Sequence, residues 1–342
     1  MLGIFKKSAP LALLAVVALA CSSALGDPLP GQVLKFQQLP MISTTVGDPT
    51  PTDAAVYYGH DERSTARLVP GTPQYQGVAM ADDFADLFDT PVVHVRWWGS
   101  YLNEKDNPDG FLKARKFLIS FETDVPAGTD GNFSHPGTPL QSEVVSLGPL
   151  SPGSGTFTES LVRPADPLLG ESLYMYNAEL ALPFDQNPDT VYWLKIVALD
   201  DQADPTQTLD WGWHNRDYTI FDQFASSPPN VLPGESLVGQ IPLNNGTADP
   251  IWHFQDDSVS SQVVITSTDL GELFVEQSQY QPQRYVSPYD GPELIGEYSK
   301  DLAFELYTYP VPEPSTLALI GVGLFCLTAY QRRRRTGSTV SS

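Results

Sequence analysis

Apolar and polar residues alternate along much of this chain with a period of two, which is typical of half-buried β-strands. In residues 92–98, Val93, Val95 and Trp97 share one face and His94, Arg96 and Trp98 share the other. The alternation recurs at residues 117–121, 191–198, 209–213 and 301–308, with Gly, Pro, Asn and Asp between the segments. The pattern predicts an all-β domain over residues 77–309, an antiparallel β-sandwich of jelly-roll type.

Residues 27–76 show less alternation and are rich in proline, glycine and threonine. We expect this segment to be an extended lead-in that wraps on the domain. Residues 54–58, Ala-Ala-Val-Tyr-Tyr, form the short strand that the pattern indicates within it.

The N-terminal apolar segment does not alternate. Lys6 and Lys7 precede an apolar stretch from Leu11 to Ala20, and small residues follow. This order predicts a secretory signal peptide over residues 1–26, which signal peptidase would remove so that Asp27 begins the mature chain. A cleavage site a few residues earlier, or lipidation of Cys21 at a lipoprotein-like box, is an alternative.

A second apolar run, residues 317–330, lies near the C-terminus. Val311, Pro312, Glu313 and Pro314 precede it, and Arg332, Arg333, Arg334 and Arg335 follow it. The run is shorter than the roughly 20 residues of a relaxed membrane-spanning helix. The arginines favour a cytoplasmic position for that end, so everything upstream is expected to lie outside.

This order of Pro-Glu-Pro, short apolar helix and arginine cluster over residues 311–335 resembles the PEP-CTERM sorting signal of exopolysaccharide-producing Gram-negative bacteria. The resemblance implies recognition by an exosortase, a membrane transpeptidase that removes the tail near Pro-Glu-Pro. The precursor would then be held in the inner membrane only transiently before it reaches the cell surface or the extracellular matrix. An ordinary tail anchor is the alternative, and it too places the domain outside the cytoplasm.

Composition narrows the picture once these end segments are set aside. Both cysteines, Cys21 and Cys326, lie in them, so no disulfide or cysteine-ligated zinc can stabilise the domain. Residues 27–331 hold 13 basic residues and all 41 acidic ones, a net charge of −28. Such a surface repels nucleic acid and other polyanions.

The domain itself carries a second resemblance. Ala81-Asp82-Asp83-Phe84, then Val95-Arg96-Trp97-Trp98-Gly99-Ser100-Tyr101, and further aromatic strands downstream are similar to a family of secreted bacterial β-sandwich domains of unknown function. It spans residues 77–308. The resemblance implies a fold and export and brings no catalytic residues.

Motifs for catalysis are lacking in the sequence. The five histidines have no zinc-binding spacing, and no Gly-x-Ser-x-Gly elbow occurs. A carboxylate pair for glycoside hydrolysis stays open, because its two acids can come from distant strands.

Two acidic loops offer hard oxygen ligands, so calcium is the one cofactor for which we find candidates. The first contains Asn103, Asp106, Asn107 and Asp109, and the second contains Asp200, Asp201 and Asp204. Neither follows the EF-hand pattern, and Asn-Pro-Asp-Gly is also a good turn.

Aromatic residues offer a binding surface instead. Neighbouring strand residues point to opposite faces, so if Trp97 is in the core, Trp98 faces outward beside His94 and Arg96. An exposed Trp98 with these two donors would stack on a neutral polysaccharide. Burial of Trp98 under a loop is the alternative.

Two functions remain after these observations. The first is an exported cell-surface or matrix protein without catalysis, with a capacity to bind glycans. The second is an extracellular hydrolase of glycoside type. Converging acids or a histidine-centred cluster in a concave pocket would favour the second.

Overall fold

The structure is a computed structural model. It describes residues 27–41, 61–102, 113–126, 128–130, 133–165, 171–201, 208–216, 236–242, 248–253, 258–267, 273–277, 279–282 and 301–310.

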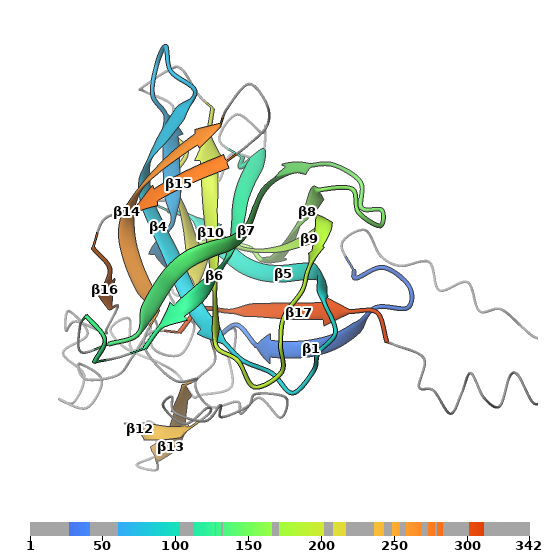
Figure 1. Cartoon of the computed structure of the whole chain (residues 1–342), viewed down its shortest axis with the longest axis vertical. Coiled ribbons are helices and arrows are strands. Elements are labelled where there is room, and N and C mark those ends of the chain that lie inside the picture. Colours follow the sequence, from blue (N-terminus) through green and yellow to red (C-terminus); the bar gives the residue numbers. More distant parts are fainter. Residues whose placement is uncertain are drawn as a thin grey trace, which may run out of the picture.

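The described residues form strands and connecting turns, so the prediction of an all-β fold is confirmed (Figure 1). Most strands belong to one 15-stranded sheet, and β12 and β13 form a separate hairpin. The strands are β1 Val33–Gln38, β2 Asp61–Arg63, β3 Thr65–Leu68, β4 Gln74–Phe84, β5 Val92–Tyr101, β6 Lys116–Val125, β7 His135–Leu147, β8 Thr156–Arg163, β9 Leu173–Phe184, β10 Tyr192–Asp200, β11 Trp211–His214, β12 Ser236–Pro242, β13 Ala248–His253, β14 Val259–Ser267, β15 Leu273–Gln277, β16 Gln281–Pro282 and β17 Phe304–Thr308.

Strand pairing closes the central part of the sheet on itself. From β5 it runs through β9, β8, β7 and β6 to β10. It returns through β3 and β2 to β11, which pairs with β5. Ser64, between β2 and β3, joins the two sides, because its N–H donates to Trp211 O and its carbonyl accepts from Ala198 N. The pairs β3–β10 and β7–β8 are parallel, which the expected antiparallel sandwich did not include.

The main core lies between the two halves of this closed sheet, and aromatic rings fill much of it. Trp97 of β5 stacks on Tyr176 of β9 with ring centroids 5.4 Å apart, and Phe117 of β6 meets both rings edge-on. Trp211 of β11 packs edge-on against Phe117 at 4.9 Å. Large buried rings of this kind supply much of the hydrophobic stabilisation that a domain without disulfides needs.

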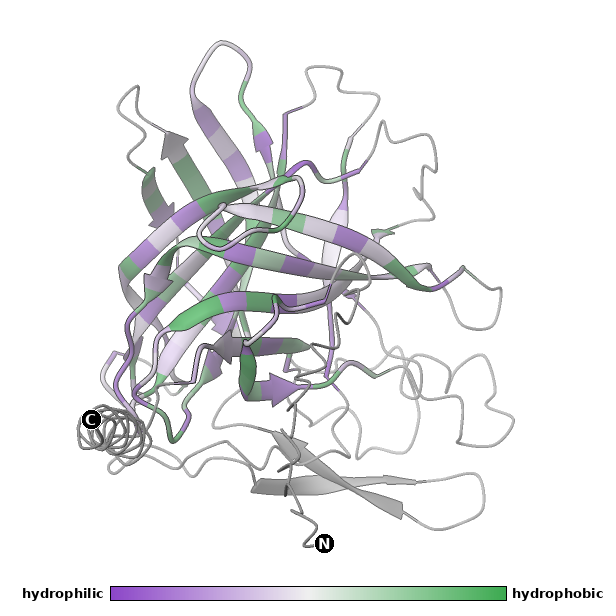
Figure 2. Cartoon of the chain, turned by 90° about the vertical axis from the view of Figure 1, so that its right-hand side faces the viewer, coloured by the Kyte–Doolittle hydropathy of each residue, from purple (hydrophilic) through white to green (hydrophobic). Residues whose placement is uncertain are grey.

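The central strand β10 is buried on both of its faces. Leu194 and Ile196 face the main core. Trp193 and Val197 face two smaller apolar clusters, which β14, β15 and the chain around Tyr280 cover. Figure 2 shows the alternation of hydrophobic and hydrophilic residues along the strands.

The sheet begins earlier in the chain than the predicted lead-in implied. Val33–Gln38 forms β1 and pairs with β17, and β4 runs across the boundary expected at residue 77. The apolar pattern did not predict β1 because one of its buried residues is a lysine. Lys35 is fully buried, and it pairs with Asp86 at 3.6 Å. A lysine at a core position interrupts the apolar alternation that marks a strand.

Several sequence predictions concern residues outside the described ranges. These are the signal peptide with Cys21, the short strand at residues 54–58, and the sorting signal at residues 311–335 with its apolar helix. Within the described ranges, no helix is long and apolar enough to cross a membrane.

Candidate functional site

Strand β5 places Trp97 and Trp98 on opposite faces, as their adjacency requires. Trp97 lies in the main core. Trp98 shares the outer face with His94 and Arg96, so the structure brings the three candidate binding residues together on one side of one strand.

The polar groups on this outer face bind one another. His94 Nδ1 lies 2.6 Å from Glu179 Oε1, and its Nε2 lies 3.1 Å from Asn177 Oδ1. Arg96 donates through Nε to Asn177 Oδ1 at 2.8 Å and through one terminal nitrogen to Glu305 Oε2 at 3.0 Å. Both ring nitrogens of His94 therefore have a protein partner.

The expectation of an exposed Trp98 platform is wrong. Trp98 is only 5% exposed and packs with Leu173, Met175 and Ala303, which lie on neighbouring segments of the same chain. Residues just after the predicted signal peptide also occupy this face: Gln32 donates to Glu179, and Asp27 lies 3.5 Å from Arg96. The protein's own groups therefore take the positions expected for a bound sugar.

The acidic loops are only partly described. Asn103, Asp106, Asn107, Asp109 and Asp204 lie outside the described residues. Asp200 accepts from Arg67 Nε and Leu209 N, while Asp201 pairs with Lys116 at 2.8 Å. Among the described residues, no group of three or more His, Cys, Asp or Glu side chains is placed to hold a metal ion.

A pocket of about 360 Å³ lies over β2, β3 and β4. Its polar groups come from Arg63, Thr65, Arg67 and Gln76. Its apolar lining comes from Leu68, Val69, Pro70 and Leu209. Small-ligand sites usually have a largely apolar wall with a few polar groups, as this pocket does. Its volume also lies within their usual range of about 300–1,000 Å³.

The two arginines of this pocket share one arrangement. Arg63 Nε lies 2.8 Å from Asp210 Oδ1, and Arg67 Nε lies 3.2 Å from Asp200 Oδ2. Arg67 Nε donates a hydrogen bond to Asp200, and Arg63 Nε forms an ion pair with Asp210. Since guanidinium has five N–H donors, the terminal nitrogens of each are left to make further bonds. The side chains are 55% and 37% exposed, so a ligand can reach them.

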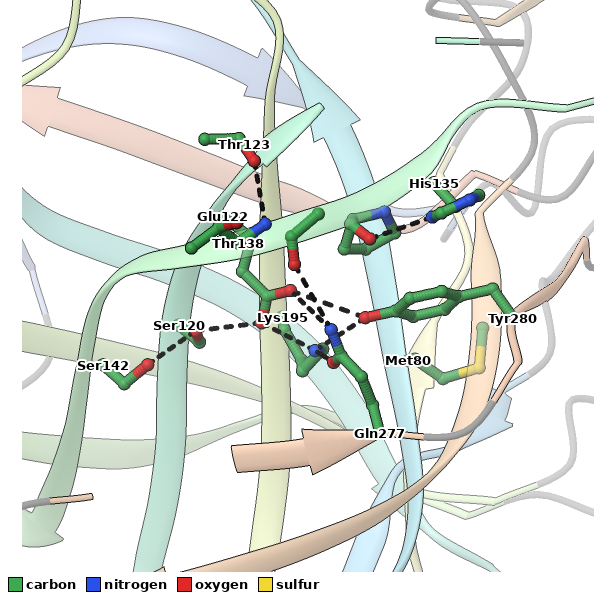
Figure 3. Close-up of polar contacts among 12 residues, drawn as sticks. Met80, Ser120, Glu122, Thr123, His135, Thr138, Ser142, Lys195, Gln277 and Tyr280 are labelled. Carbon is green, nitrogen blue, oxygen red and sulfur yellow. Dashed lines mark hydrogen bonds and ion pairs between the residues drawn. The ribbon is translucent and has the colours of Figure 1, made fainter. Parts of the chain in front are cut away.

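A second polar cluster is buried, and we call it the Lys195 network (Figure 3). Lys195 of β10 lies 2.6 Å from Glu122 Oε1 of β6, contacts Gln277 Oε1 at the end of β15, and lies 3.1 Å from the Tyr280 hydroxyl. Gln277 Nε2 donates to Glu122 Oε2 at 3.3 Å. Ser120 also donates to Glu122, at 3.1 Å. These groups come from three separate parts of the chain.

Burial governs the electrostatics of the network. The side chains of Lys195 and Glu122 are both 0% exposed. Loss of hydration lowers the pKa of Lys195 from its usual value, and the nearby Glu122 carboxylate opposes this only in part. The same burial raises the pKa of Tyr280, and Glu122 raises it further. The low polarity around the network therefore favours the uncharged forms of Lys195 and Tyr280.

Sequence reasoning did not single out Lys195, Glu122 or Gln277. The alternation over residues 191–198 puts Lys195 on the same strand face as Trp193 and Val197. The available signal was the charge itself, since a lysine inside a strand that is apolar on both faces must be paired when it is buried. The sequence pattern could not predict the partners of Lys195, because Gln277 lies 82 residues away from it in sequence.

Comparison with known proteins gives two family matches. The model of a family described as a domain of unknown function, DUF7901, matches residues 34–306, and the PEP-CTERM protein-sorting motif matches residues 310–335. No curated protein and no solved structure matches the chain.

Proposed function

This chain belongs to the DUF7901 family and carries a PEP-CTERM protein-sorting motif behind that domain, and we propose that it is a non-catalytic protein of the cell surface or extracellular matrix. The motif is the observation that carries the proposal, since PEP-CTERM signals are recognised by exosortase. The precursor is held in the inner membrane by residues 317–330 until the tail is removed.

The mature protein is expected to lack the sorting tail, because a short apolar run behind Pro-Glu-Pro suits a processed signal better than a lasting anchor. Intact-mass analysis of surface-extracted protein measures this. Replacing Pro312, Glu313 and Pro314 by alanine should leave the tail attached, while Gln331→Ala, in the same tail, should be processed normally. Recovery of the parent chain with Arg332–Arg335 still attached contradicts the processing.

The pocket over β2, β3 and β4 supports a binding role for the domain. Its two guanidinium groups present terminal N–H groups beside an apolar wall. Guanidinium binds carboxylate through two parallel N–H···O bonds, and the apolar wall suits the C–H face of a sugar ring. The ligand class that fits is a sugar-sized monocarboxylate such as a uronate.

Local charge argues for a monoanion. Asp210 and Asp200 already balance Arg63 and Arg67, so the pocket has no large excess of positive charge. A phosphate dianion or a polyanion would meet these carboxylates at short range. The neutral polysaccharide expected earlier depended on an exposed Trp98 and on the net charge of the whole surface, neither of which describes this pocket.

Glucuronate is expected to bind more tightly than glucose, its uncharged counterpart, and more tightly than glucose 6-phosphate. Arg67→Ala should weaken glucuronate binding about tenfold or more, because it removes charge-assisted hydrogen bonds. Titration calorimetry measures all three ligands. Lys116→Ala is the matched control, since it also removes a cation that pairs with an aspartate but lies outside the pocket lining. Absence of glucuronate binding by the parent, or equal binding by Arg67→Ala, overturns this assignment.

A further inference from the structure

The Lys195 network brings together an amine, a carboxamide and a carboxyl group, which is more than an ion pair needs. Lys195 Nζ contacts Oε1 of the Gln277 carboxamide, and Glu122 accepts from Lys195 Nζ and from Gln277 Nε2. An amine held on a primary carboxamide is the reactant pair of a transamidation. Nothing in the sorting or binding roles accounts for this arrangement.

The amine must lose a proton before it can act as a nucleophile. Glu122 Oε1 lies 2.6 Å from Lys195 Nζ and can accept that proton. Burial of Lys195 lowers its pKa and so favours loss of this proton.

The leaving group faces the same carboxyl. Gln277 Nε2 donates to Glu122 Oε2 at 3.3 Å, while Glu122 Oε1 faces the amine. One carboxyl group therefore lies on the path between the nitrogen that must lose a proton and the nitrogen that must gain one. Such a positioned acid and base accelerates proton transfer by roughly 10²–10⁴-fold.

We propose that Lys195 and Gln277 condense within the folded protein to form an isopeptide bond, with Glu122 as the proton carrier. The neutral Lys195 amine attacks Gln277 Cδ, so that an Nζ–Cδ bond forms and the Cδ–Nε2 bond breaks. A proton from Nζ passes through Glu122 to the departing nitrogen, which leaves as ammonia. Nothing is oxidised or reduced, and no other reactant is needed.

The bond would join the middle of β10 to the end of β15, two points 82 residues apart in sequence. β15 lies at the edge of the sheet, beyond β4 and β14. A cross-link over this distance restricts the unfolded chain in the way that a disulfide does. It requires no cysteine, and the chain has none between residues 22 and 325.

Peptide mapping of the purified full-length protein by tandem mass spectrometry tests the proposal. We expect a branched peptide that joins Lys195 to Gln277, with the summed mass of its two arms less one ammonia, and no tryptic cleavage after Lys195. Recovery of the folded parent only as linear peptides, with Lys195 and Gln277 unmodified, would falsify the proposal.

Two variants test the roles of the groups. Lys195→Arg keeps the cation and removes the amine, and Glu122→Gln keeps the shape and removes the proton carrier. Both are expected to lose the branched peptide completely, while Lys113→Arg, at an ion pair with Glu159 outside the network, should keep it. If either variant fails to fold, the linkage measured in the parent protein still decides the question. A branched peptide that persists in Glu122→Gln overturns the role of Glu122.

Discussion

Above pH 10, the free energy of unfolding of this protein is expected to fall by about 7 kcal/mol for each pH unit. The buried tyrosines with a raised pKa cause this dependence, namely Tyr75, Tyr101, Tyr176, Tyr280 and Tyr307. Burial raises the pKa of each above the ordinary value of 10.0, and a nearby carboxylate raises it further.

The direction follows from the protons that each state binds. In the unfolded chain these tyrosines ionise near pH 10, whereas in the folded protein they keep their protons to higher pH. Their contribution is therefore complete below pH 10 and is lost as the pH rises toward the folded pKa values. Each contributes about 1.4 kcal/mol per pH unit within that window. A typical stability of 5–15 kcal/mol would be exhausted within roughly one to two pH units.

Denaturant titrations at several pH values between 9 and about 12, followed by tryptophan fluorescence, measure this slope. Tyr176→Phe should reduce the slope by about a fifth, because one of the five ionisations is removed. Tyr309→Phe is the matched control, since this ring is exposed. A parent slope no steeper than about 1.4 kcal/mol per pH unit, the contribution of a single tyrosine, contradicts the prediction.

Trp211→Ala is expected to lower the free energy of unfolding by about 3–5 kcal/mol, the usual cost of truncating a fully buried tryptophan. The indole packs edge-on against Phe117 and Tyr176, and its N–H donates to the Tyr176 hydroxyl at 3.1 Å. The substitution leaves a cavity beside Phe117. It also leaves the buried Tyr176 hydroxyl without this donor, which adds to the cost.

The backbone of Trp211 should keep its pairing in this variant, because Ser64 and Thr65 bond to its N–H and C=O. Equilibrium unfolding in urea would show a lower midpoint with an unchanged slope. Trp211→Phe is the comparison, since it retains an aromatic ring at the site and should lose clearly less stability. A loss below about 1 kcal/mol in Trp211→Ala would show that the surrounding rings close the cavity.

The outer face of β5 shows how far strand periodicity reaches. Alternation correctly assigned Trp97 to one face and Trp98 to the other. It carried no information on what lies above Trp98, because that depends on Leu173 of β9 and on Ala303 just before β17, which are far from Trp98 in sequence. The prediction of an exposed Trp98 was wrong because alternation assigns a side chain to a strand face and does not show whether other residues cover that face.

The two candidate sites differ in what could be read from the chain. Arg63 and Arg67 are ordinary charged residues in sequence, and only the pairing of β2 with β11 and of β3 with β4 and β10 makes them the lining of a pocket. Lys195 did carry a local signal, as a lone charge in an apolar strand. Its partners Glu122 and Gln277 became identifiable only in the folded chain.

The sequence by itself determined the all-β class and the sorting signal, because both depend on local order. A period of two fixes which side chains share a strand face, and Pro-Glu-Pro followed by an apolar run and arginines is a linear motif. The tertiary structure alone decided the closure of the sheet through Ser64, the burial of Trp98 and the meeting of Lys195 with Gln277. These depend on contacts between residues far apart in the chain, and periodicity specifies the direction of a side chain without specifying what packs against it.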